Sequence, residues 1–493
     1  MSLLRAIAPK PGSEPERHSL DPGDWASTRA QAHRMLDDML DHVQGVRDGP
    51  VWRPMPSEAR AAFGEGLPWA ASPLEQVHDE FMAQVAPYAV GNLHPRFMGW
   101  VHGGGNVAGM LADMVAAGLN ANCGGRDHAP IEVERQVTRW MAELFGFPET
   151  ASGLFVTGTS MANLIAVLAA RNAALGPAAR IDGVGEAGAG LTAYASAGAH
   201  GCIARALDFC GLGSAALRAI PQLESGAIDP GELAAAIAAD RAAGLDPFMI
   251  VGTAGTVDTG AVDDLSALAD IARREGLWLH VDGAYGALAK LSPELAPLLK
   301  GVERADSIAF DFHKWGQVPY DAGFVLMRDR GRHKAAFASS AAYLSRGERG
   351  LSAGEDWPCD FGPDLSRGFR ALKVWFAFKT YGSDALGETI AHTCRLAREM
   401  AARVDSERDL ERLAPVTLNI VCFRFKGSDA LNAEIVTRLQ ESGLAAPSTT
   451  TLDGRLAIRC AIVNHRTVSE DVHIVVDEVL RLGRLLAQSG ESA

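Results

Sequence analysis

The segment LWLHVDGAY at residues 277–285 and the segment SIAFDFHKW at residues 307–315 lie about thirty positions apart. Each contains an apolar run of the length and composition typical of a buried strand. The first run ends at the carboxylate of Asp282, and the second is followed by the amine of Lys314. Ligands of parallel α/β sheets bind beyond the carboxyl ends of the strands, so the two side chains are candidates for one site.

Lys314 follows a histidine and precedes a tryptophan, which predicts an apolar setting for its amine. Such a setting disfavours the ammonium form and frees an amine to attack a carbonyl carbon. A carboxylate such as that of Asp282 suits the pyridine nitrogen of pyridoxal 5'-phosphate, because it keeps that nitrogen protonated and the ring electron-poor. The alternative for Lys314 alone is an ordinary solvated lysine after a strand.

The composition narrows the class of protein. The chain has 493 residues, 47% hydrophobic and 22% charged, which predicts a globular protein of two or three domains. The net charge of −14 argues against nucleic acid or an anionic membrane as a partner. No apolar run reaches the length of a membrane span, and the N-terminus lacks the apolar stretch of a signal peptide. The seven cysteines are scattered, which argues against a disulfide framework or a metal site and indicates a cytoplasmic protein.

The residue patterns predict three parts. Residues 1–90 form an N-terminal helical segment, residues 91–385 alternate strands with helices, and residues 386–493 form a small α+β domain. The alternation predicts a mostly parallel sheet covered by helices. Residues 181–190, rich in Gly and Ala, are expected to be a flexible surface loop. The predicted strands are 154–156, 191–196, 248–251, 277–281, 307–310, 323–327, 417–425 and 456–463. The predicted helices are 30–46, 74–85, 161–171, 203–210, the one after Asp229, 265–275, 386–404, and one from the capping box Thr467-x-x-Glu470 to about 487.

The segment FVTGTSMAN at residues 155–163 joins a predicted strand to a predicted helix. Free backbone N–H groups at the helix start, together with the hydroxyls of Thr159 and Ser160, would make an anion site. An ordinary Ser/Thr helix cap explains the same motif equally simply.

The ordered set of the 155–163 turn, His200, the HVDGAY segment, His313-Lys314-Trp315 and Arg459 resembles the pyridoxal-phosphate-dependent amino acid decarboxylases of the aromatic amino acid, histidine and glutamate decarboxylase family. The resemblance runs from about residue 51 to the end. It implies the fold type I, PLP-dependent transferase-like architecture: a large domain with a mostly parallel seven-stranded sheet and a small C-terminal α+β domain.

By this resemblance Lys314 would carry pyridoxal 5'-phosphate, and Asp282 would pair with its ring nitrogen. Thr159, Ser160 and His313 would hold its phosphate. His200 would stack on the ring, and the small Ala284 would let the ring lie close to the strand.

The resemblance also implies substrate contacts. Arg459 would face the substrate α-carboxylate, although an internal salt bridge explains a buried strand arginine equally well. Tyr343, at the start of a loop rich in Gly and charge, would protonate the substrate carbon after CO2 leaves. The side chains of Trp100, Asn122 and Tyr320 would line the substrate pocket.

Three departures from the family pattern stand out. Asp311 replaces a frequent asparagine, and a carboxylate near a phosphate is unfavourable. Val257 replaces a common threonine, which removes a hydroxyl. Asn122 and Gly124 stand where aromatic amino acid decarboxylases carry bulky apolar residues.

The resemblance implies decarboxylation of an L-amino acid, with an aromatic one as the first expectation. The alternatives are a polar or acidic substrate of the glutamate, aspartate or diaminobutyrate type, and aldehyde synthesis or transamination on the same fold. Tyr343 and His200 argue against the aldehyde route, and the presence of Lys314 and Asp282 argues against a non-catalytic binding module. The family implies a homodimer whose active site lies at the interface and whose N-terminal helices wrap the partner.

Overall fold

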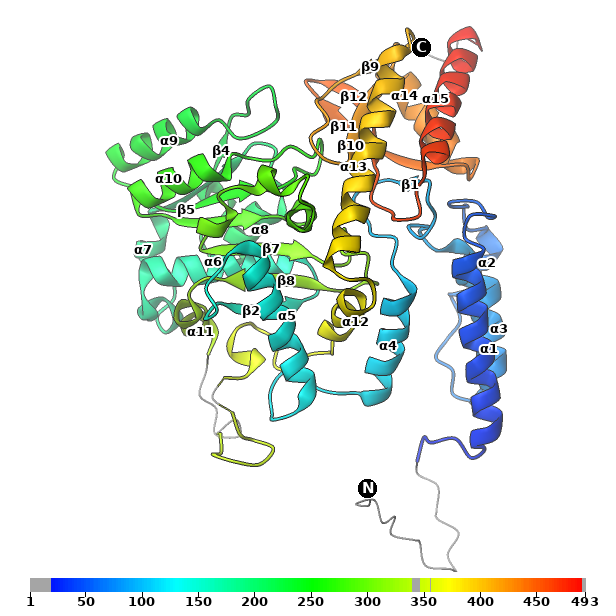
Figure 1. Cartoon of the computed structure of the whole chain (residues 1–493), viewed down its shortest axis with the longest axis horizontal. Coiled ribbons are helices and arrows are strands. Elements are labelled where there is room, and N and C mark those ends of the chain that lie inside the picture. Colours follow the sequence, from blue (N-terminus) through cyan, green and yellow to red (C-terminus); the bar gives the residue numbers. More distant parts are fainter. Residues whose placement is uncertain (1–18, 339–345, 355, 490–493) are drawn as a thin grey trace, which may run out of the picture. The chain divides into compact units, whose positions relative to one another are not determined.

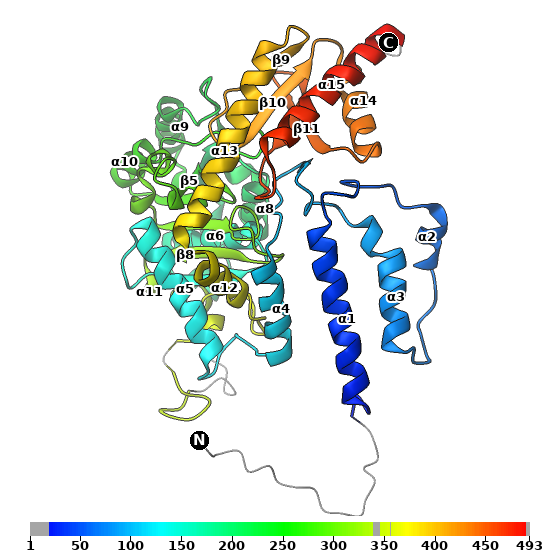
Figure 2. The same ribbon diagram turned by 45° about the vertical axis from the view of Figure 1, so that its right-hand side comes forward.

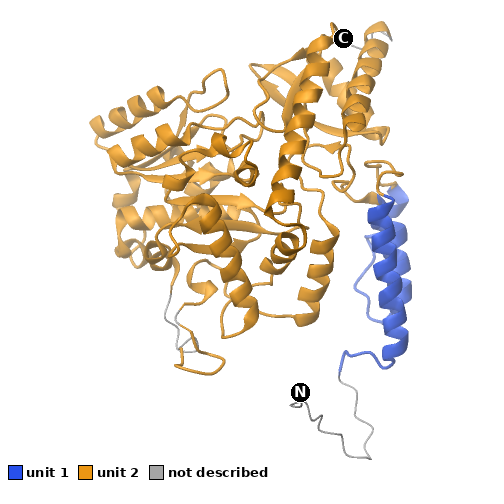
Figure 3. Ribbon diagram, viewed as in Figure 1, with its two compact units in different colours: residues 1–45, 57–87 blue, residues 46–56, 88–493 orange. Residues whose placement is uncertain are grey.

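The computed structural model describes residues 19–338, 346–354 and 356–489. Contacts divide the chain into two compact units (Figure 3), one of residues 1–45 and 57–87 and one of residues 46–56 and 88–493. The division into parts at residues 90 and 385 stays a prediction from the sequence.

The larger unit contains a seven-stranded sheet in the order β2-β8-β7-β6-β5-β3-β4 (Figure 1). Only β8 runs against the others, because it pairs antiparallel with both of its neighbours. The predicted mostly parallel α/β sheet is therefore confirmed, while β4 was not predicted. The strands are β2 (Ser152–Val156), β3 (Leu191–Ser196), β4 (Leu217–Ile220), β5 (Asp246–Thr253), β6 (Trp278–Asp282), β7 (Ser307–Asp311) and β8 (Gly323–Met327).

Helices cover both faces of this sheet (Figure 2). Because successive strand residues point to opposite faces, Phe324 and Leu326 of β8 join one core cluster while Val325 and Met327 join the other. The first face packs against α5 (Ala129–Phe145), α9 (Pro230–Ala242), α10 (Leu265–Glu275) and α12 (Ala371–Tyr381). The second packs against α6 (Thr159–Leu175), α8 (Cys202–Phe209) and α11 (Arg330–Phe337).

Local signals explain several helix ends. The Asp229 carboxylate caps the start of α9, as its sequence predicts, and Gly276 ends α10 in the left-handed conformation. Helix α4 (Val107–Leu119) was not predicted, and it begins where Asn106 accepts the N–H of Gly109. The predicted loop at 181–190 is wrong in part, since it contains the short helix α7 (Gly185–Ala189).

A second, five-stranded sheet has the order β1-β11-β12-β10-β9. Its strands are β1 (Phe97–Met98), β9 (Leu410–Arg412), β10 (Ile420–Phe425), β11 (Ala446–Leu452) and β12 (Arg455–Ala461). Its apolar cluster includes residues of α13 (Ser383–Ser406), α14 (Asp429–Glu441) and α15 (Ser469–Ser489). β1 pairs parallel with β11, so a segment more than three hundred residues upstream completes this sheet.

The smaller unit consists of α1 (Trp25–Gln44), α2 (Ser57–Ala62) and α3 (Leu74–Gln84). Polar contacts join α1 to α3, including the ion pair between Arg34 and Asp79 and the contact between Gln31 and His78. Several large apolar side chains in and between these helices are exposed, among them Trp25, Phe63, Leu67 and Trp69. Among the helices of the described residues, none is long and apolar enough to cross a membrane.

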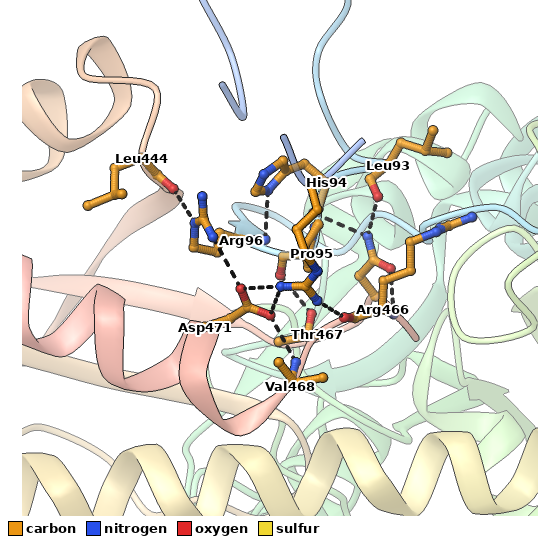
Figure 4. A network of polar contacts seen from close by, with 11 residues as sticks. Leu93, His94, Pro95, Arg96, Leu444, Arg466, Thr467, Val468 and Asp471 are labelled. Carbon is orange, nitrogen blue, oxygen red and sulfur yellow. Dashed lines mark hydrogen bonds and ion pairs between the residues drawn. The ribbon is translucent and has the colours of Figure 1, made fainter. Parts of the chain in front are cut away.

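A buried carboxylate, Asp471, ties the start of α15 to two distant segments (Figure 4). Oδ1 of Asp471 pairs with Nη1 of Arg47 at 2.9 Å and with Nη1 of Arg96 at 3.3 Å. Oδ2 accepts the N–H of Val468 at 3.0 Å. The predicted capping box is wrong, because the Thr467 hydroxyl donates to the Pro95 carbonyl and Asp471 caps the helix instead.

We expect Asp471→Ala to lower the free energy of unfolding by about 2–4 kcal/mol, because two guanidinium groups lose their buried partner. Asp477→Ala, on the same helix, is the matched control: its carboxylate pairs with Arg403 but its side chain is 62% exposed. That control should change stability by less than about 0.5 kcal/mol. Urea unfolding of both variants measures the difference, and equal stabilities would contradict the anchoring role of Asp471.

Candidate active site

A cavity of about 400 Å³ opens at the carboxyl edge of the seven-stranded sheet. Because the parallel strands end at the same edge, residues from distant parts of the sequence converge there. The cavity is lined by Trp100, Val101, His102, Thr157, Gly158, Thr159, Ser160, His200, Cys202, Thr253, Gly255, Val257, Asp282, Ala284, Tyr285, Asp311, His313, Lys314 and Tyr320.

Asp282, the last residue of β6, is 4% exposed. Its Oδ2 accepts a hydrogen bond from Nδ2 of Asn163 at 3.0 Å, and its Oδ1 accepts the N–H of Ala284 at 3.1 Å. Burial raises the pKa of Asp282, while the charge of Lys314 and these two donors oppose the rise. The carboxylate is thus held at the cavity by donors that favour its ionised form.

Lys314 follows β7 by three residues, and its Nζ lies 3.1 Å from Oδ2 of Asp311. Oδ1 of Asp311 accepts the N–H of Thr159 at 2.7 Å, at the first turn of α6. Asp311, which the sequence left without a role, therefore joins the lysine to the helix start. A carboxylate in this place uses one of the free N–H groups that would otherwise be open to an anion.

His313 turns its Nδ1 toward the backbone, where it accepts the N–H of Ala322 at 2.9 Å. Burial lowers the pKa of His313 to about 4, so the ring is neutral near pH 7 and carries its proton on Nε2. The Tyr320 ring packs on it with ring centroids 4.1 Å apart. His313 is therefore an N–H donor fixed by its backbone contact and its aromatic neighbour.

The first turn of α6 combines hydroxyl groups with a tight backbone approach. Oγ1 of Thr159 is buried and has no hydrogen-bond partner among the described residues, while Ser160 is exposed. Gly158 lies so close to Gly323 that a Cβ on Gly323 would come within 2.4 Å of the Gly158 Cα. Glycine at position 323 thus lets the turn before α6 lie against β8.

Aromatic side chains form one wall of the cavity. His102 stacks on Phe97 with ring centroids 5.6 Å apart and on Trp100 at 5.9 Å. Its other neighbour is Tyr320, which meets it edge-on at 5.9 Å. Burial and the charge of Lys314 lower the pKa of His102, so this wall is uncharged near pH 7.

Arg459, on β12, is 3% exposed and donates chiefly to backbone carbonyls. Its Nε donates to the Val257 carbonyl at 2.9 Å, and its Nη1 donates to the Trp100 carbonyl at 3.1 Å. Both acceptors belong to cavity-lining residues. The bond from Arg459 uses the backbone of residue 257, so it does not depend on whether that residue is valine or threonine.

The remaining predicted site residues are placed as follows. His200 is exposed at the cavity, with Nδ1 accepting the N–H of Cys202 at 3.2 Å. Ala284 lines the cavity, and its carbonyl accepts the N–H of Asp311. Asn122 is not among the lining residues; its Oδ1 accepts the N–H groups of Gly124 and Arg367. Tyr343 lies outside the described residues.

The cavity offers polar atoms that the described protein leaves unused. Oγ1 of Thr159, Oγ1 of Thr253, the hydroxyl of Tyr285 and Nδ1 of His102 are buried without hydrogen-bond partners among the described residues. Unpaired buried polar groups are costly, so their gathering around one cavity favours a polar ligand there. With a carboxylate, an amine and a helix N-terminus at the same edge, these residues fit pyridoxal 5'-phosphate.

These features define an enzyme of the α/β class with an amine and a carboxylate at the sheet edge. The family model described as the pyridoxal-dependent decarboxylase conserved domain matches residues 56–426. The chain belongs to this family and is a pyridoxal-phosphate-dependent amino acid decarboxylase.

Two relatives cover nearly the whole chain. The aromatic-L-amino-acid decarboxylase of Bacillus atrophaeus is 34% identical over 90% of this chain and 93% of its own length. The phenylacetaldehyde synthase of Arabidopsis thaliana is 29% identical over 92% of this chain and 95% of its own.

Two solved structures share the fold. Oryza sativa TDC, crystallised with PLP and tryptamine, superposes with a TM-score of 0.87 at 27% identity, covering 95% of this chain and 100% of that one. The glutamate decarboxylase domain of diaminobutyrate-pyruvate transaminase and L-2,4-diaminobutyrate decarboxylase from Vibrio parahaemolyticus gives 0.84 at 28% identity, covering 95% and 98%. Both the fold class and the cofactor expected from the sequence are thereby confirmed.

Three residues at this site had no role predicted from the sequence: Asn163, Cys202 and His102. Asn163 lies one helical turn after Thr159, so the spacing alone could have placed it near the same strand ends. Cys202 and His102 carry no comparable sequence signal, since they reach the cavity only through the packing of α8 and the segment after β1.

Thr159→Val should separate cofactor binding from folding. The substitution removes a buried hydroxyl that has no partner, so the cofactor-free protein should keep its stability or gain about 1 kcal/mol. Its Kd for pyridoxal 5'-phosphate should rise by about fivefold to tenfold, since one hydrogen bond is lost. Both quantities can be measured, by urea unfolding and by titration of the cofactor absorbance.

Thr138→Val is the matched control, because the Thr138 hydroxyl is also buried but donates to the Glu134 carbonyl at 2.9 Å. It should lose about 0.5–1 kcal/mol of stability and keep its affinity for the cofactor. Unchanged affinity in Thr159→Val would remove Thr159 from the phosphate site.

Proposed function

We propose that the chain converts an aromatic L-amino acid to the corresponding amine and CO2, with pyridoxal 5'-phosphate bound covalently at Lys314. The observation that carries this proposal is the cavity in which Lys314 and Asp282 line the sheet edge beside the aromatic wall of Trp100, His102 and Tyr320. The name of the Bacillus relative and the tryptamine in the Oryza sativa structure support the aromatic choice.

When bound, the cofactor supplies an electron sink for the electrons of the bond to the leaving carboxylate. Asp282 contributes by keeping the ring nitrogen protonated, which its acceptor geometry supports. Thr159, Ser160 and His313 bind the phosphate, and His200 and Ala284 hold the two faces of the ring. Arg459 would orient the substrate carboxylate, because orientation selects which bond breaks.

Asp311 bears on how the phosphate is held. Its carboxylate lies between the first N–H of α6 and the Lys314 amine, both of which attract a negative charge. If Lys314 carries the cofactor, its nitrogen would no longer pair with Asp311 alone. We infer that Asp311 orients the Thr159 turn through its hydrogen bond. The hydroxyls of Thr159 and Ser160 and the Nε2–H of His313 bind the phosphate.

The chain acts as a homodimer in this proposal, with the site at the interface. Exposed Trp25, Phe63, Leu67 and Trp69 support it, since apolar side chains of this size on one small helical unit favour a protein partner. The scattered free cysteines support a cytoplasmic location. Light scattering of the purified chain measures the oligomeric state directly.

Aldehyde formation is the second candidate, favoured by the similarity to a phenylacetaldehyde synthase. The two outcomes differ in what happens at the carbon that CO2 has left. Tyr343 as a proton donor gives the amine, whereas an unprotonated carbon is open to oxygen. A polar substrate such as diaminobutyrate is tested in the same assay.

A screen of the twenty amino acids and diaminobutyrate should give CO2 with an aromatic L-amino acid and the matching amine in equal amount.

Lys314→Ala should lower this activity by more than about 10³-fold, because the variant lacks the attacking amine. Borohydride reduction and peptide mapping should place the cofactor on Lys314. Lys300, exposed on the surface, gives the control variant Lys300→Ala; a label on any other lysine would refute the assignment.

Tyr343→Phe should keep part of the CO2 release while amine formation falls by about 10²–10⁴-fold, the usual contribution of a general acid. The products should shift to aldehyde, ammonia and hydrogen peroxide, with one O2 consumed for each aldehyde. Oxygen uptake and amine chromatography measure the ratio. The control is Tyr381→Phe, a tyrosine 42% exposed on α12. Amine formation at the wild-type rate without aldehyde would show that Tyr343 is not the donor.

A further inference from the structure

Four polar side chains behind Asp282 form a continuous buried hydrogen-bond chain. Nε1 of Trp278 donates to Oγ of Ser307 at 2.8 Å, and Oγ of Ser307 lies 2.8 Å from Nδ1 of His280. Nε2 of His280 lies 2.8 Å from Oδ1 of Asn163, whose Nδ2 donates to Oδ2 of Asp282 at 3.0 Å. Ser307, His280 and Asn163 are each 0% exposed, so water does not compete with these contacts.

Regular secondary structure holds the side chains of this hydrogen-bond chain, which come from β6, β7 and α6. Trp278, His280 and Asp282 alternate along β6 and therefore point to the same face, the face covered by α6. Ser307 begins β7 and is the register partner of His280. Asn163 projects from α6 onto the same row. Three buried polar side chains at every second position of a central strand are unusual, because that face is otherwise apolar.

The two ends of the chain fix its direction. An indole N–H can only donate, and a carboxylate can only accept. Asn163 must therefore turn its Nδ2 toward Asp282, which leaves its Oδ1 to accept from the Nε2–H of His280. The neutral His280 ring then accepts at Nδ1 from the Ser307 hydroxyl, and Oγ of Ser307 accepts from Trp278. Burial lowers the pKa of His280 to about 3, so no charge enters the chain near pH 7.

We infer that Asn163, His280 and Ser307 are positioning residues that hold the Asp282 carboxylate as a fixed acceptor for the pyridine N–H of the cofactor. This inference rests on the proposed role of Asp282. Without Nδ2 of Asn163, the donor that remains to Oδ2 among the described residues is the weak one of Cys202, whose Sγ lies 4.0 Å away. A buried carboxylate that loses a hydrogen bond takes up a proton more readily, and a protonated Asp282 no longer keeps the ring nitrogen charged.

The test uses the holoenzyme loaded with pyridoxal 5'-phosphate labelled with nitrogen-15 at the ring. The chemical shift of that nitrogen reports whether it is protonated, independently of turnover. Asn163→Leu, which keeps the approximate side-chain size, should move the shift toward the unprotonated value and lower kcat by roughly tenfold to hundredfold, the worth of a hydrogen bond to a charged group. KM should change much less, because Asn163 is fully buried and is not among the residues that line the cavity.

Ser307→Ala is the second variant and keeps the test usable should Asn163→Leu fail to fold. It removes a donor that is three hydrogen bonds away from Asp282 and should move the same shift in the same direction by a smaller amount. In addition, the nitrogen-15 signals of His280 in the cofactor-free wild type should show the proton on Nε2. A proton on Nδ1 would overturn the direction of the chain.

The protein offers a matched control elsewhere on the same sheet. Oγ of Ser152 lies 2.8 Å from Nδ1 of His333, both side chains are buried, and burial lowers the pKa of His333 to about 3. Ser152→Ala removes a similar buried Ser–His contact that has no hydrogen-bonded link to Asp282 among the described residues. It should lose stability comparably to Ser307→Ala and leave the ring-nitrogen shift and kcat unchanged.

Asp282→Asn distinguishes a failure of the proposed role of Asp282 from a failure of the proposed role of the positioning residues. If Asp282→Asn leaves the ring-nitrogen shift at its wild-type value, the proposed role of Asp282 is wrong. If Asp282→Asn moves the shift while folded Asn163→Leu and Ser307→Ala leave it unchanged, Asp282 keeps its role and the positioning chain is refuted. Movement in all three, with none in Ser152→Ala, supports the inference.

Discussion

A negative charge buried at the end of a central strand is the constraint around which this structure is arranged. Asp282 is 4% exposed, and burial alone would favour its protonated form. The ionised form needs donors that do not move, and the fold provides one from α6, through Asn163, and one from the backbone at Ala284. A strand that was apolar on both faces would pack more simply, but it could not hold a carboxylate at this edge.

The same edge must also attract an anion and hold an amine. The parallel strands bring the start of α6, the end of β6 and the residues after β7 to one place. Asp311 lies between the first N–H of α6 and Lys314, so its carboxylate is paired with both a backbone donor and an amine inside the site. Several hydroxyl and ring atoms there have no hydrogen-bond partner in the described part of the chain, as expected of a site that binds a polar ligand.

In the proposed function, substrate choice and cofactor chemistry depend on different layers of the molecule. The proposed cofactor-binding groups lie at the carboxyl edge of the seven-stranded sheet, whereas Arg459 lies on the five-stranded sheet and Trp100 follows its first strand. Arg459 reaches the carbonyls of Val257 and Trp100, and so couples the second sheet to the wall of the cavity. If the proposed roles hold, changes in the smaller sheet would alter the choice of substrate without disturbing the proposed cofactor-binding groups.

Much of this could be predicted from the sequence, because local patterns determine it. The apolar runs before Asp282 and Lys314 marked strands, the alternation of strands and helices indicated a parallel sheet, and strand ends indicated the site. Only the tertiary structure decided which distant groups meet. The bond from Thr159 to Asp311, the reach of Arg459 to Val257, and the row from Trp278 through Asn163 to Asp282 all join segments far apart in the chain. Periodicity describes neighbours along one element and carries no information about the side chains that another element brings to it, and for this reason these contacts had no sequence signal.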